Sequence, residues 1–142
     1  MKSIRIDRRK RLKEEPHTGH NRWHPDIPAV IEADQGEEVV LQTRDALDGR
    51  LNPATTKSDF ADIESGAIHP LTGPVLVKGA QPGDLLEIEF LDIVPEPWAF
   101  SVILPGLGFL RDVFIDPFMV HWDIADGWAT SKQIPGIRVP GA

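Results

Sequence analysis

The sequence has no cysteine, no long apolar run and no serine in a nucleophile-elbow motif, and each absence excludes a class of protein. Without cysteine the chain forms no disulfide, no thiolate metal site and no cysteine nucleophile. No apolar stretch approaches the roughly 20 residues of a membrane span, and the N-terminus lacks the apolar core of a signal peptide. The absence of Gly-x-Ser-x-Gly argues against an elbow serine. We therefore expect a cytoplasmic protein that uses neither a cysteine nor an elbow serine as a nucleophile.

The charge of the chain is acidic overall, with a net value of -7 at pH 7. This charge disfavours nonspecific binding to nucleic acid or to an anionic membrane, so we expect neither as a partner. Basic residues nevertheless gather in residues 1–13, which could contact RNA, although a solvated terminal face is the simpler interpretation. We treat 1–13 as a basic N-terminal segment and 14–142 as the folded domain.

Thirteen prolines and twelve glycines divide the chain into short segments, a pattern that favours strands over long helices. The clearest strand pattern is 84–93, where apolar residues nearly alternate. Further segments with strand-like composition are 39–43, 74–77, 100–104 and 118–124. No window has the apolar face of a helix, and 58–63 can form only a turn or two after a serine cap. We predict a mainly β fold with sandwich-like antiparallel sheets, long Pro/Gly-rich loops and little helix.

The densest group of polar side chains lies in residues 14–26, which contain three of the five histidines. Two prolines and a glycine within this stretch disfavour a helix, so we expect an ordered loop of the kind that often carries a site. His20 and His24 could bind one divalent metal ion through their imidazole nitrogens. Alternatively, these histidines form hydrogen bonds with the backbone.

Two more polar clusters lie beside predicted strands. Asp45 and Asp48 could orient a water molecule, bind a cation or share a proton. Aspartates at this spacing also close turns through hydrogen bonds to the backbone, and on sequence alone the turn is the favoured interpretation. His69 precedes Pro70, which predicts an extended backbone at the histidine. Held in that rigid segment, His69 could act as a ligand or base, or could cap a loop structurally.

Taken in order, six segments of the chain resemble the acetamidase/formamidase family. The segments are 17–28, 43–49, 69–75, 79–86, 105–110 and 134–142. One such motif would be a weak signal, whereas six in family order are a strong one. The resemblance implies hydrolysis of short aliphatic amides, formamide or acetamide, to ammonia and the carboxylate by a β-rich homo-oligomer. Because family members look much longer than this chain, we expect it to be the N-terminal part, incomplete at its C-terminus, with the remaining half as its partner.

Combined with this resemblance, the polar clusters suggest metal-assisted hydrolysis, in which a divalent ion such as zinc or calcium activates water. The expected metal ligands are His20, His24 and Asp45. The expected catalytic residues are His69, Asp45 and Asp48; His69 would return a proton to the leaving nitrogen and Asp48 would orient the water.

The expected substrate-binding residues are Asn21, Arg22 and Trp23, of which Asn21 or Arg22 would steady the developing oxyanion. The alternative from another class is a noncatalytic β-sandwich subunit, or a truncated paralogue, that acts in assembly.

Overall fold

A computed structural model of the chain describes residues 1–60 and 68–141. The chain forms two compact units. As far as their residues are described, the first comprises Met1–Asn52 and Ile63–Glu87, and the second comprises Pro53–Asp62 and Ile88–Ala142. Within the described residues, no helix is both long enough and apolar enough to cross a membrane.

Three two-stranded sheets and two short 3-10 turns build the first unit. The parallel pairs are β1 (Lys2–Ile4) with β4 (Val39–Leu41), and β3 (Ile31–Ala33) with β6 (Val75–Val77). The antiparallel pair is β2 (Gly19–His20) with β5 (Leu71–Thr72), and the turns are η1 (Leu12–Glu14) and η2 (Pro16–Thr18). Four buried apolar side chains form a small core: Ile4, Ala33, Leu47 and Leu51. The basic segment 1–13 therefore contributes both a strand and a core residue to this unit.

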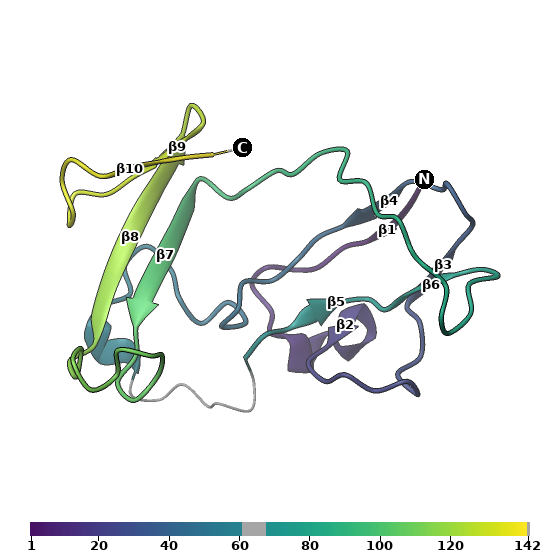
Figure 1. The fold of residues 1–142 in the computed structure, drawn as a ribbon, viewed down its shortest axis with the longest axis horizontal. Coiled ribbons are helices and arrows are strands. Elements are labelled where there is room, and N and C mark those ends of the chain that lie inside the picture. Colours follow the sequence, from purple (N-terminus) through teal and green to yellow (C-terminus); the bar gives the residue numbers. More distant parts are fainter. Residues whose placement is uncertain (61–67, 142) are drawn as a thin grey trace. The chain divides into compact units, whose positions relative to one another are not determined.

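A four-stranded antiparallel sheet, with strand order β10-β9-β8-β7, dominates the second unit (Figure 1). Its strands are β7 (Trp98–Ile103), β8 (Phe118–Ala125), β9 (Trp128–Thr130) and β10 (Arg138–Pro140), and the short 3-10 helix η3 (Lys57–Phe60) belongs to the same unit. Asp126 and Gly127 connect β8 to β9 with φ angles of 51° and 75°. Two successive positive φ angles match the right-handed twist of a hairpin, which explains the tight connection.

The mainly β fold class with little helix is confirmed. Strands form in 39–43, 74–77, 100–104 and 118–124, and η3 is the expected short turn, although residues 61–63 of that prediction lie outside the described part. The strand predicted at 84–93 is wrong, because these residues carry no regular structure and their side chains are exposed. Apolar alternation makes a segment suitable for a sheet, but a strand also needs a partner, and no described strand pairs with this one.

Candidate functional site

Three of the segments that sequence analysis singled out meet in the first unit. The backbone N–H of Gly73 donates to the carbonyl of Thr18 at 3.1 Å. The hydroxyl of Thr72 donates to the carbonyl of Gln42 at 2.7 Å, and the N–H of His69 donates to the carbonyl of Ala46, also at 2.7 Å. The region around η2 and β2, the loop after β4 and the approach to β5 are therefore joined directly, although they are far apart in the sequence.

Arg44 is a buried residue whose side chain links the segments of this junction. Its guanidinium donates through Nη1 to the Thr18 hydroxyl at 3.1 Å and through Nη2 to the Glu15 carboxylate at 2.5 Å. Its Nε also lies 3.5 Å from an oxygen of Asp48, and the Arg44 side chain is only 5% exposed. Planar guanidinium groups suit such multiple pairing. The sequence does not reveal the role of Arg44, because nothing in the local pattern marks an arginine after a strand as buried.

The two aspartates near Arg44 have internal partners. The carboxylate of Asp45 accepts hydrogen bonds from the N–H groups of Leu47 and Gly49, both at 2.8 Å. The carboxylate of Asp48, which is buried, accepts from the N–H of Leu12 at 3.0 Å. The turn that the sequence favoured at Asp45 is therefore present. A catalytic role for either aspartate stays a prediction, because in the structure both carboxylates accept hydrogen bonds from backbone N–H groups.

His69 lies exposed beside this turn. Its φ angle is 57°, so the extended backbone predicted from the following proline is wrong. The hydrogen bond from the His69 N–H to the carbonyl of Ala46 fixes the backbone at this position. This tertiary contact overrides the preference for an extended conformation that the following proline imposes. A non-glycine residue in this region of φ stores strain, a feature that clusters at functional sites.

The predicted metal ligands differ in the hydrogen bonds that they make. Nδ1 of His20 lies 2.7 Å from the carbonyl of Arg22, an acceptor, so Nδ1 is the donor and Nε2 is the ring nitrogen left for a ligand. This is the arrangement of a histidine that binds a metal ion. Nδ1 of His24 instead accepts from the N–H of Asp26 at 3.2 Å, and both oxygens of Asp45 accept backbone hydrogen bonds. Among the described residues no three His, Asp or Glu side chains are grouped as a metal site, so the predicted ligands do not fit an ion as a set.

The predicted substrate-binding residues follow β2 directly. Nη1 of Arg22 donates to the carbonyl of Asn21 at 2.8 Å. Trp23 is 88% exposed, and its ring stands edge-on to His20 with the ring centres 6.5 Å apart. The group thus presents the exposed aromatic ring of Trp23 next to His20, a surface that suits contact with a small molecule.

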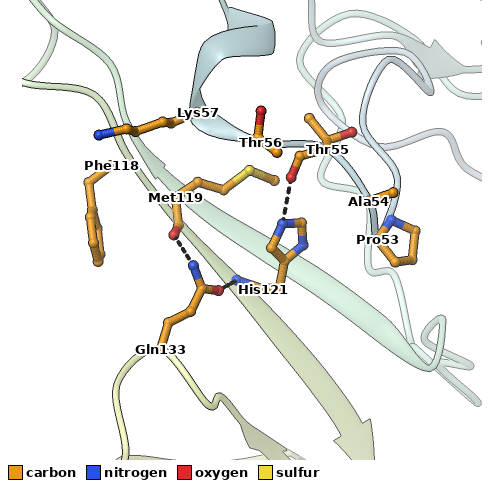
Figure 2. Close-up of a pocket in the computed structure, with 9 residues that line it drawn as sticks. All are labelled: Pro53, Ala54, Thr55, Thr56, Lys57, Phe118, Met119, His121 and Gln133. Atoms are coloured by element: carbon orange, nitrogen blue, oxygen red, sulfur yellow. Dashed lines mark hydrogen bonds between the residues drawn. The ribbon is translucent and has the colours of Figure 1, made fainter.

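A hollow of about 440 Å³ in the second unit was not anticipated from the sequence. It is lined by 53–57, Phe118, Met119, His121 and Gln133 (Figure 2). Nε2 of His121 lies 2.8 Å from the carbonyl of Thr55, and the Gln133 amide links the His121 N–H to the Met119 carbonyl. The sequence placed His121 only in a strand, since its second contact, with Thr55, is too distant in the chain for a local pattern to reveal.

Comparison with known proteins assigns the chain to a family. A model of the Acetamidase/Formamidase family matches residues 5–142. The chain belongs to this family. An acetamidase from Mycolicibacterium smegmatis is 36% identical, with 96% of this chain and 37% of the relative covered. A formamidase from Methylophilus methylotrophus is 32% identical, with 99% and 36% covered.

Solved structures agree with this membership of the acetamidase/formamidase family. A gamma lactamase from Delftia acidovorans matches with a TM-score of 0.91 and 34% identity, over 99% of this chain and 36% of that one. An acetamidase from Bacillus halodurans matches with a TM-score of 0.69 and 27% identity, over 82% of this chain and 38% of that one. The chain thus spans little more than a third of the length of these relatives.

Proposed function

We propose that the chain contributes to an amide hydrolase that converts short aliphatic amides, formamide or acetamide, to ammonia and the carboxylate. Relatives named acetamidase and formamidase support the reaction class. The observation that carries the proposal is the junction in the first unit, where the backbone of His69 is bonded to the turn of Asp45 and Asp48 and the strand of His20 pairs with β5, which follows His69. Polar loops that a rigid scaffold fixes in place are where catalytic sites form.

His69 is the proposed base. Its imidazole would take a proton from a water molecule as the water oxygen attacks the amide carbon. The tetrahedral intermediate would place negative charge on the former carbonyl oxygen, which Asn21 or Arg22 would stabilise. His69 would then give its proton to the nitrogen, the C–N bond would break, and ammonia would leave. Arg44 and the two aspartates would keep the His69 loop in place.

The remaining features of the proposal concern location, assembly and a metal ion. We propose a cytoplasmic homo-oligomer in which the chain acts together with the part of the family sequence that it does not match. A divalent ion stays part of the hypothesis, and His20 is the residue whose geometry suits one. Since the three predicted ligands do not fit an ion as a set, none of the steps above depends on it.

The test uses this chain co-expressed with the unmatched part of the Mycolicibacterium smegmatis acetamidase, with ammonia release from formamide and acetamide as the readout. The His69→Ala variant should lower kcat by at least about 100-fold, the usual contribution of a general base. His17→Ala, an exposed histidine without an assigned role, is the matched control and should retain activity. A strong chelator, added in parallel, tests the metal. Full activity of His69→Ala would rule out the proposed base.

A further inference from the structure

The loop between β7 and β8, residues 104–117, exposes an unusual amount of apolar surface. Six large apolar side chains in this apolar loop have exposed fractions between 49% and 106%: Leu107, Phe109, Leu110, Val113, Phe114 and Ile115. Single exposed apolar residues are normal, but a contiguous group of this kind marks an interaction surface. Phe109 is as exposed as in an extended peptide, so nothing in the described part of the chain covers it.

The apolar loop also has a defined conformation and a hollow. The N–H groups of Val113 and Phe114 donate to the carbonyl of Leu110 at 3.0 and 2.9 Å, which folds the loop into a turn. A hollow of about 520 Å³ lies along its second half, lined by Lys57, Ile103, Pro117, Phe118 and residues 113–116. A preformed surface costs little entropy to bind, and an apolar hollow accepts apolar side chains.

The chemistry of the apolar loop favours a polypeptide over a lipid surface. Its charged residues are Arg111, Asp112 and Asp116, so it has more negative than positive charge. Peripheral membrane segments instead place several lysines or arginines beside their apolar residues. The net charge of -7 for the whole chain acts against an anionic bilayer in the same way.

The solved relatives contain more polypeptide than this chain matches. The fold of this chain matches the Delftia acidovorans structure with a TM-score of 0.91 while covering only 36% of that chain. The larger part of such a chain therefore lies outside the matched region. We propose that the apolar loop is the docking surface for the polypeptide corresponding to this unmatched part of the family sequence, whose apolar side chains fill the hollow at residues 113–118. The inference rests on family membership and holds whether or not His69 is the base.

Co-purification tests the docking surface without using activity. The tagged 142-residue chain is co-expressed with the unmatched part of the Mycolicibacterium smegmatis acetamidase, and the eluate is sized by light scattering. We expect a complex with equal amounts of the two polypeptides. Phe109→Asp and Ile115→Asp, both at exposed positions, should each reduce the bound fraction by about tenfold or more, because a charge would be buried against apolar groups.

Lys132→Glu, an exposed residue outside the apolar loop, is the control and should bind like the unmodified chain. Circular dichroism of each purified variant shows whether its β structure is retained. The proposal is overturned if the unmodified chain does not capture the polypeptide, if it instead forms only a complex of two copies of itself, or if folded Phe109→Asp and Ile115→Asp bind as well as Lys132→Glu.

Discussion

Arg44 joins two carboxylates and a hydroxyl within the first unit, at the point where the three polar segments meet. Replacing it with methionine keeps much of the side-chain volume but leaves Glu15 and Asp48 without their shared cation. Removing one partner of a buried ion pair strands the other charge, so Arg44→Met should lower the free energy of unfolding by about 3 kcal/mol. Urea unfolding of the purified chain measures this change.

The control for Arg44 is Arg5→Met, because Arg5 is exposed. A substitution at such a surface position should change the free energy of unfolding by about 0.5 kcal/mol or less. Equal losses in the two variants would contradict the structural role of Arg44 and would point to net charge as the cause.

Asp7 provides a prediction about pH. The Arg9 side chain, with its backbone N–H, donates three hydrogen bonds of 3.0 Å to the Asp7 carboxylate and lowers its pKa from the ordinary 3.8 to about 2. Because the pKa is lowered in the folded chain, the stabilising contribution is complete above pH 3.8 and is lost as pH falls through about 2. NMR titration of the Asp7 carboxyl carbon measures the shift.

The Arg9→Ala variant should move the Asp7 pKa back toward 3.8, since the side-chain hydrogen bonds from Arg9 are the largest cause of the shift. Arg5→Ala should leave it near 2. If Asp7 titrates with its ordinary pKa in the unmodified chain, the ion pair with Arg9 does not persist in solution.

At the scale of elements, the pairing of β2 with β5 depends on a glycine. A Cβ added at Gly19 would collide with the carbonyl oxygen of Leu71, a backbone atom that cannot rotate away. Gly19→Ala should therefore separate the two strands and lower the free energy of unfolding by about 1–3 kcal/mol, the range for a forced backbone shift. Hydrogen exchange at the β2–β5 amides reports the separation directly.

Gly36→Ala is the matched control for Gly19. An added Cβ at Gly36 would meet no atom within 4 Å, and the substitution has only the backbone cost of a φ angle of 78°. This variant should leave exchange at β2 and β5 unchanged. Faster exchange there in Gly36→Ala than in Gly19→Ala would contradict the argument from close packing.

The elements show what local pattern can and cannot predict. Composition located β4, β6, β7 and β8, because apolar and β-branched residues between turn residues suit a pleated strand. The parallel pairing of β1 with β4 joins residues more than 30 positions apart and leaves no local signal. The segment 84–93 has the best alternation in the chain and still forms no strand, because pairing is a property of two segments.

The candidate site was predictable to a similar extent. The Asp45 turn follows from side-chain hydrogen bonds over two to four residues, so its spacing was sufficient to favour it. The burial of Arg44 and the φ angle of His69 depend on tertiary contacts, and a single sequence contains no pattern that encodes them.

At the scale of the whole molecule, we expect catalysis to need more of the family sequence than these 142 residues. The relatives named acetamidase and formamidase are covered to only 36–37% of their length. In the described part of the first unit, Asp45, Asp48 and Arg44 already make internal contacts, so these three side chains are not placed to bind and orient an amide. Positioning the substrate supplies a large part of enzymatic rate enhancement. We therefore expect the purified chain alone to release ammonia from formamide no faster than buffer.

The assembly of this chain with the unmatched part of the Mycolicibacterium smegmatis acetamidase should release ammonia, and the activity should fall by about tenfold or more when Phe109→Asp weakens docking. Adding excess of the second polypeptide should then restore activity in proportion to the complex formed, because Phe109 lies on the docking surface and far in sequence from His69. Ammonia release by the isolated chain that His69→Ala abolishes would show instead that the first unit binds and orients the amide unaided. In that case the apolar loop would act in assembly but would not be needed for activity.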